Sequence, residues 1–76
     1  MLPFPSLTPR ERGERGARRR FTAARHKIGM TQLEAARVLG VGTTTLEDWE
    51  RGAARLPAWA LDEIERLAGE RTKEAA

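Results

Sequence analysis

Residues 31–52, which read TQLEAARVLGVGTTTLEDWERG, contain two short helical patterns on either side of a tight turn that holds glycine. The first pattern opens with a capping box, in which Thr31 is followed three residues later by Glu34. It predicts a helix from about residue 32 to residue 39, because small and apolar residues recur there on one face. Glycine after this helix ends it and opens the second pattern.

The second pattern predicts a helix from about residue 43 to residue 51 with two different faces. At about 100° per residue, Leu46 and Trp49 share one side, and polar or charged residues occupy the other. The residue before this helix is Gly42, which is a weaker N-terminal cap than serine or threonine. Two helices joined in this way, with the second exposed, form the layout that places a helix in the major groove of DNA.

Helical patterns flank this stretch on both sides. A leading helix can start at a second capping box around Thr8, and Gly29 is placed to end it. Its buried face is predicted from the spacing i, i+4, i+7 and i+11 of four residues, Ala17, Phe21, Ala24 and Ile28. A last helix is predicted from about residue 58 to residue 69, and the apolar residues that can close the core are Leu56, Ala60, Ile64 and Leu67.

The predicted fold is therefore all-α, a compact bundle of four helices, with five helices as the alternative. We expect a flexible N-terminal tail over residues 1–8, one domain over residues 9–69 and a flexible C-terminal tail over residues 70–76. A chain of 76 residues holds one small domain at most, and such a domain buries only about 60% of its unfolded surface.

Composition argues against several classes of protein. The chain has no cysteine, and one histidine, His26, is too few to hold a metal ion, so we expect no metal site and no cofactor. No stretch approaches the roughly 20 apolar residues of a membrane span, and the N-terminus has no apolar signal-peptide core. We therefore expect a soluble, cytoplasmic protein that makes no contact with a membrane.

Enzyme activity is not expected. The chain has no cysteine nucleophile, no pairing of serine with histidine and no glycine-rich loop that could hold a phosphate. Glu47 and Asp48 are adjacent acids, but one turn of an exposed helix gives them no desolvation that would separate their pKa values.

Charge is distributed unevenly along the chain. The formal net charge is +3, but residues 1–30 hold eight Lys or Arg against two Glu, whereas residues 31–76 hold six Lys or Arg against nine Asp or Glu. A basic N-terminal third suits a polyanionic partner such as DNA. A solvated helix face would give the same composition, and charge alone does not distinguish the two.

The chain from about Arg20 to Leu67 resembles the helix-turn-helix family of phage repressors and Cro. The resemblance rests on IGMTQLEAARVLGV, TTTLEDWERG and LPAWALDEIERL, in which core residues, turn residues and spacing agree together. It covers about two-thirds of the chain. It implies an all-α domain whose third helix is the recognition helix, and a protein that binds double-stranded DNA.

The resemblance also implies roles for individual residues. Gln32 corresponds to the glutamine that hydrogen-bonds the DNA backbone and helps to orient the next helix. The base-reading positions correspond to Thr43, Thr44 and Asp48, and Glu47 and Arg51 lie beside them. A carboxylate can accept a hydrogen bond from cytosine N4, so an acidic recognition helix predicts discrimination between bases rather than high affinity.

Two further roles follow from the resemblance. Arg25 and Glu50 correspond to an ion pair that ties the first helix to the third, and Trp49 corresponds to a core position. The cations available to contact phosphates are Arg18, Arg19, Arg20, Arg51 and Arg55. Trp59 lies towards the exposed side of the last helix, where it either packs partly on its own domain or anchors a dimer.

Three functions are compatible with these features. The first is a small bacterial or phage repressor that binds an inverted-repeat operator as a homodimer and occupies a promoter. The second is the antitoxin of a toxin–antitoxin module, which would repress its own operon and bind a toxin. The third is a helix-turn-helix domain that binds another protein, which the acidic residues of the third helix would favour.

Overall fold

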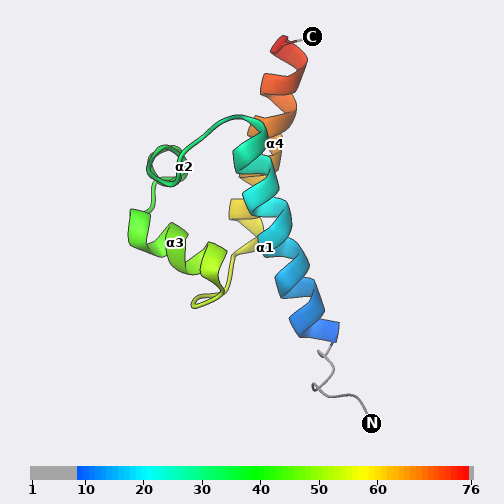
Figure 1. Cartoon of the computed structure of the whole chain (residues 1–76), viewed down its shortest axis with the longest axis vertical. Coiled ribbons are helices and arrows are strands. Elements are labelled where there is room, and N and C mark those ends of the chain that lie inside the picture. Colours follow the sequence, from blue (N-terminus) through cyan, green and yellow to red (C-terminus); the bar gives the residue numbers. More distant parts are fainter. Residues whose placement is uncertain (1–8, 76) are drawn as a thin grey trace.

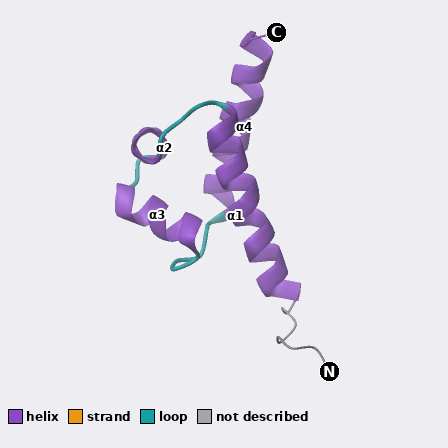
Figure 2. Ribbon diagram, viewed as in Figure 1, coloured by secondary structure: helices purple, strands orange, loops and turns teal. Residues whose placement is uncertain are grey.

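The computed structural model describes the backbone of residues 9–75 and the side chains of residues 12–71. The described residues form four helices and no strand, joined by short loops (Figure 2). The helices are α1 (Pro9–Lys27), α2 (Gln32–Leu39), α3 (Thr43–Arg51) and α4 (Ala58–Ala75). The all-α prediction is confirmed, with four helices rather than five, and the predicted tail over residues 1–8 lies outside the described residues.

The helices form two pairs. The long helices α1 and α4 pack against each other, and the short helices α2 and α3 pack against each other on one side of that pair (Figure 1). Because α3 also contacts α1 and α2 contacts α4, the two pairs share one core. The N-terminal half of α1 and the C-terminal half of α4 extend beyond this core at opposite ends of the molecule (Figure 1).

The predicted bounds of α2 and α3 are confirmed, and local signals explain them. Thr31 accepts a hydrogen bond from the backbone of Glu34 at 3.1 Å, and the Glu34 carboxylate accepts one from the backbone of Thr31, so the capping box is complete. Gly40 and Gly52 end the two helices with φ of 73° and 87°, which favour glycine. Gly42 provides no side-chain hydrogen bond at the start of α3.

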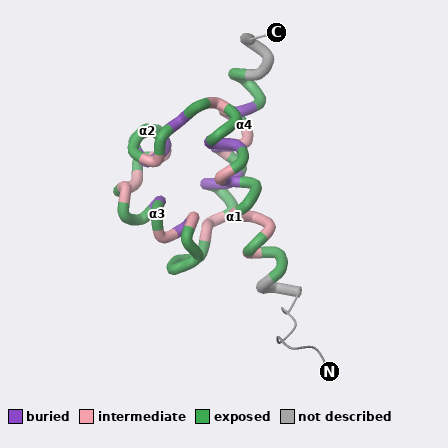
Figure 3. Tube along the Cα trace, viewed as in Figure 1, coloured by how far each residue is buried: buried purple, intermediate pink, exposed green. Residues whose placement is uncertain are grey.

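The core lies where the helices face one another (Figure 3). The largest fully buried side chains are Phe21, Leu46 and Ile64, one each from α1, α3 and α4. The small residues Ala35 and Ala36 let α2 approach closely. Phe21, Leu46 and Ile64 lie on the faces that the sequence predicted to be buried, and Ala35 and Ala36 belong to the small-residue face expected for residues 32–39. Three other buried residues were not predicted, Met30, Leu61 and Ala68.

The predicted end of the last helix at Gly69 is wrong, because α4 continues to Ala75. A glycine inside a helix costs only about 1 kcal/mol, and the ion pair between Arg66 and Glu70, at 2.5 Å, spans that position. Arg71 also donates to the backbone carbonyl of Ile28 at 3.4 Å, which ties the continuing helix to the end of α1. A domain boundary at residue 69 stays a prediction.

Candidate nucleic-acid interface

One side of α3 faces away from the rest of the domain. Thr44, Glu47 and Arg51 are exposed on this side, and Asp48 beside them is partly buried. Leu46 and Trp49 are buried on the opposite side, as the helical period requires. Thr43 is partly buried and Thr45, which the sequence did not single out, is exposed. The α3 outer face, defined here as Thr44, Glu47, Asp48 and Arg51, is thus available to a partner.

A nearly buried ion pair fixes α3 against α1. Arg25 donates from Nε to one carboxylate oxygen of Glu50 at 2.8 Å and from Nη2 to the other at 2.9 Å. The Arg25 and Glu50 side chains are only 11% and 10% exposed. Arg25 also donates from Nη1 to the carbonyl of Met30 at 2.9 Å, so the same guanidinium holds the loop between α1 and α2. Such a bidentate pair fixes the relative orientation of the two side chains as well as the distance between them.

Gln32 lies at the first turn of α2 and reaches the same ion pair. Its Nε2 donates to Glu50 Oε1 at 3.4 Å. The side chain is therefore placed between α2 and α3, where it can help to orient α3. Its predicted contact with the DNA backbone stays a prediction.

The acidic character of the α3 outer face is partly compensated. Arg51 donates to Asp48 Oδ1 at 2.5 Å, one turn back on the same helix. The Asp48 carboxylate can still accept a further hydrogen bond, because each of its oxygens has more than one lone pair. Glu47 forms no ion pair with any side chain that the structure describes.

Of the five arginines predicted to contact phosphates, Arg51 pairs with Asp48, and the other four divide into three groups. Arg20 is bound to Glu65 of α4 at 2.5 Å, and this hydrogen bond raises the pKa of Arg20 above its usual value. Arg55 is paired with Glu14 of α1 at 3.7 Å. Arg18 and Arg19 form no ion pair among the described side chains. Arg20 thus has an acidic partner and its two neighbours do not, although the three arginines are consecutive in sequence.

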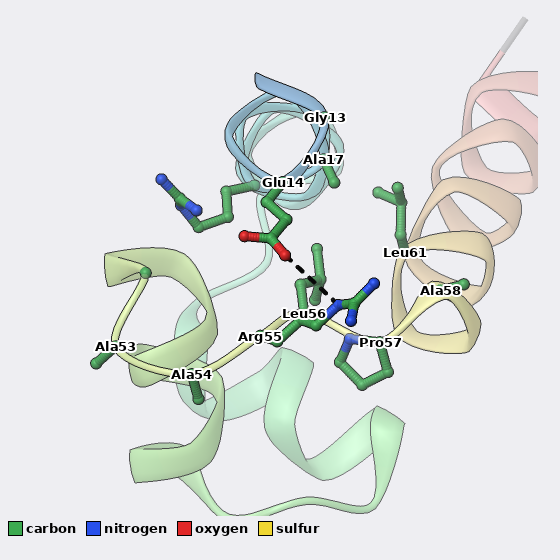
Figure 4. Close-up of a pocket in the computed structure, with 12 residues that line it drawn as sticks. Gly13, Glu14, Ala17, Ala53, Ala54, Arg55, Leu56, Pro57, Ala58 and Leu61 are labelled. Carbon is green, nitrogen blue, oxygen red and sulfur yellow. Dashed lines mark ion pairs between the residues drawn. The ribbon is translucent and has the colours of Figure 1, made fainter. Parts of the chain in front are cut away.

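Two hollows adjoin the end of α3. One is lined by one side of α1 over residues 13–18, the loop of residues 52–57 and the start of α4, and the pair of Glu14 and Arg55 crosses it (Figure 4). Ala17, Leu56 and Leu61 give it apolar walls (Figure 4). The second hollow lies between α1 and the end of α3, and most of its lining is basic or polar: Arg15, Arg18, Arg19, Thr22, His26 and Arg51.

The last candidate residue, Trp59, lies at the start of α4. It is 52% exposed, and its ring packs edge-on against Trp49 with the ring centroids 6.0 Å apart. Trp49 in turn contacts Phe21 edge-on at 6.4 Å, so the core position predicted for Trp49 is confirmed. Trp59 therefore packs partly on its own domain and leaves half of its surface open to a partner.

None of the described helices is long and apolar enough to cross a bilayer. Across the described part of the chain, His, Asp and Glu side chains do not gather in groups of three that could hold a metal ion.

Comparison with known proteins agrees with the geometry. The sequence profile of the helix-turn-helix family matches residues 22–69, more than half of the chain and all of α2 and α3. No significant match was found among curated proteins or among solved structures. The matched segment carries a DNA-binding helix-turn-helix of the regulatory type. The chain belongs to the helix-turn-helix family of lambda-repressor and Cro type.

Proposed function

We propose that this protein is a transcription regulator that inserts α3 into the major groove of a specific DNA sequence and represses by occupying a promoter. The observation that carries the proposal is the combination of an exposed α3 outer face with the ion pair of Arg25 and Glu50 behind it. A recognition helix must hold a fixed direction if its side chains are to meet the same base edges each time.

The chemistry of the first turn of α3 suits contact with DNA. Thr43 and Thr44 lie where backbone N–H groups and the helix dipole favour a phosphate. A threonine hydroxyl can donate or accept a hydrogen bond, and its methyl group can contact thymine. Farther along the same face, the Asp48 carboxylate can accept from cytosine N4.

The regulator would act as a homodimer on an inverted repeat, with half-sites about 10 base pairs apart. Trp59 supports this arrangement, because a half-exposed tryptophan next to the core is the kind of residue that protein interfaces favour. Arg51, Arg55, Arg18 and Arg19 would supply the phosphate contacts that set the register on the duplex.

Selection of bound fragments from a random double-stranded DNA pool, at about 150 mM salt, tests the proposal directly. We expect an enriched inverted repeat. Thr44→Ala and Asp48→Ala should each change the preferred bases, because a mismatched contact costs about 1–3 kcal/mol. Thr45→Ala is the matched control, since this residue lies outside the α3 outer face.

The outcomes separate the alternatives. A single enriched half-site would support sequence-specific DNA binding and contradict binding as a homodimer. Unchanged preference in both Thr44→Ala and Asp48→Ala would remove these residues from base reading. No enrichment at all would overturn the proposal and would make the α3 outer face a surface for a protein partner. Repression itself is tested with a reporter gene behind the selected sequence, whose expression should fall when the protein is present.

A further inference from the structure

The hollow that the pair of Glu14 and Arg55 crosses brings together three segments that are far apart in sequence (Figure 4). It is called the loop hollow below, and it is lined by one side of α1 over residues 13–18, by the loop of residues 52–57 and by the first turn of α4. Its volume is about 570 Å³, within the range of roughly 300–1,000 Å³ that is typical of small-molecule sites. The proposed insertion of α3 into DNA gives the interior of this hollow no role.

The walls of the loop hollow are mostly apolar. Ala17 of α1, Leu56 of the loop and Leu61 of α4 line it, and all three also belong to the core or pack against it (Figure 4). Ala53 and Ala54 add methyl groups along the loop. An apolar molecule that entered the hollow would remove this surface from water, which favours binding.

The charges around the loop hollow favour an anion. Two guanidinium groups line it, those of Arg18 and Arg55, against the single carboxylate of Glu14. Helix α4 also begins here, because Pro57 and Ala58 belong to the lining, and its first turn holds no acidic residue. The N-terminal end of a helix carries partial positive charge and N–H groups without partners inside the helix, so it stabilises an anionic group.

The guanidinium of Arg55 is available to such an anion. Its closest approach to the Glu14 carboxylate is 3.7 Å, which is longer than a hydrogen bond, and the two side chains are 69% and 35% exposed. An exposed pair of this kind contributes little to stability, so replacing it costs little. A better-placed carboxylate can accept two parallel hydrogen bonds from one guanidinium, which Glu14 does not do.

From these contacts we infer that the loop hollow binds a small monocarboxylate with an apolar body. The carboxylate pairs with Arg55 beside the start of α4, and the apolar body lies against Ala17, Leu56 and Leu61. The consequence for regulation rests on the proposed function, in which Arg18 and Arg55 contact DNA phosphates. A bound carboxylate competes for these arginines, so the ligand lowers the affinity for DNA, and DNA lowers the affinity for the ligand by the same factor.

NMR titration of the isotope-labelled protein in the absence of DNA tests the site. The probe is phenylbutyrate, which joins one carboxylate to an apolar body. Its neutral amide lacks the charge, and acetate lacks the apolar body. We expect phenylbutyrate to cause saturable shifts in the backbone amide signals of Ala17, Ala54 and Leu61, and we expect the two controls to bind much more weakly.

Two glycines of α1 give a matched pair of variants. A Cβ added at Gly13 or at Gly16 meets no atom within 4 Å, so both positions have room for a side chain. Gly13 lines the loop hollow and Gly16 does not. Gly13→Leu should therefore fill the hollow and abolish the saturable binding of phenylbutyrate, whereas Gly16→Leu should leave it unchanged. Circular dichroism confirms that both variants are folded.

A third variant tests the charged contact. Arg55→Gln should weaken the binding of phenylbutyrate about tenfold, because a hydrogen bond between two charged groups is lost. It should leave the binding of the neutral amide unchanged. Equal binding of phenylbutyrate and its amide, or shifts that persist in Gly13→Leu, would overturn the site. Signals of the hollow that move with protein concentration in the absence of the probe would assign it to a second copy of the chain and would also overturn the site.

The effector role is measured separately with a duplex that the protein has selected. Saturating phenylbutyrate should weaken DNA binding severalfold in the wild-type protein and have no effect in Gly13→Leu, as fluorescence anisotropy of the labelled duplex would show. Binding of phenylbutyrate without this change would contradict the effector role. If the protein selects no DNA sequence, the proposed function is wrong, and the titration without DNA still decides whether the ligand site exists.

Discussion

Helix α1 has a joint with α3 and a joint with α4, and each joint contains one ion pair between an arginine of α1 and a glutamate of the other helix. The two ion pairs differ in how far they are buried. Arg25 and Glu50, between α1 and α3, are 11% and 10% exposed, and Arg20 and Glu65, between α1 and α4, are 62% and 35% exposed. Removing one partner costs little at an exposed pair and about 3–5 kcal/mol at a buried one, because only the buried charge that is left alone has lost its water.

The difference follows from how much apolar surface each helix contributes. The nine-residue α3 offers Leu46 and Trp49 to the core, and its remaining residues are polar. The longer α4 offers four buried residues, Ala60, Leu61, Ile64 and Ala68. The position of α4 is thus set mainly by apolar packing. The shorter α3 buries only two apolar side chains, so the ion pair of Arg25 and Glu50, which acts as a polar brace, has a larger share in setting its direction.

The largest expected effect comes from breaking the joint with α3. Glu50→Gln should lower the free energy of unfolding by about 3 kcal/mol, because it leaves the charge of Arg25 nearly buried without its partner. Urea unfolding followed by tryptophan fluorescence measures the change, and DNA binding at a temperature where the variant is still folded should also fall.

Glu65→Gln is the matched control for that substitution. It removes the same carboxylate from the exposed pair and should change the unfolding midpoint far less. If the two variants lose similar stability, the contrast between the joints is wrong and burial does not distinguish them.

A second prediction concerns the joint with α4. Ile64 is fully buried, and Ile64→Val should lower the free energy of unfolding by about 1 kcal/mol through the loss of one methylene group. Calorimetry gives the value, and the DNA affinity of the folded variant should be unchanged. A loss of affinity in the folded variant would mean that α4 also sets the direction of α3.

The sequence predicted the bounds of α2 and α3 because their signals are local. The capping box at Thr31 and the glycines Gly40 and Gly52 each act within one turn of the helix that they define. The end of α4 could not be predicted in this way. The helix continues past Gly69, and the hydrogen bond that the structure describes between the continuing part and the end of α1 joins Arg71 to Ile28, which is 43 residues away in sequence.

The same distinction applies to the candidate site. A run of three arginines gave no sign that Arg20 would turn to Glu65 while Arg18 and Arg19 would not, since Glu65 lies 45 residues away. A signal for the hollow between α1 and the end of α3 was nevertheless present. Its α1 residues Arg15, Arg19, Thr22 and His26 follow the spacing i, i+4, i+7 and i+11, which places them on one helix face. The burial of Arg25 and Glu50 could not be predicted from the sequence, because it results from the packing of the helices around the core.

A smaller effect tests whether the stability of α3 depends on its N-terminal cap independently of the ion pair of Arg25 and Glu50. Gly42 has extended backbone angles and no capping side chain, and an added Cβ would meet only Thr45 Oγ1 at 3.9 Å. Gly42→Ser should therefore raise the free energy of unfolding by a few tenths of a kcal/mol. The gain should remain in the Glu50→Gln background if cap and brace act independently, which a double-mutant cycle measures.

The smallest expected effect belongs to the exposed pair within α4. A hydrogen bond from Arg66 lowers the pKa of Glu63 below its usual value of 4.5. Because this pKa is lower in the folded state, the pair stabilises the fold above pH 4.5, and that contribution is lost as the pH falls through the lowered value. NMR titration of the Glu63 carboxyl group should show the low pKa, and Arg66→Gln should restore the usual one. Since both side chains are exposed, removing this pair should alter the acid limb of the stability curve less than Glu50→Gln alters it at neutral pH. If Glu63 titrates at its usual pKa in the wild-type protein, Arg66 and Glu63 do not form a lasting ion pair in solution. The difference in stability between this exposed pair and the buried pair that holds α3 would then be larger than expected.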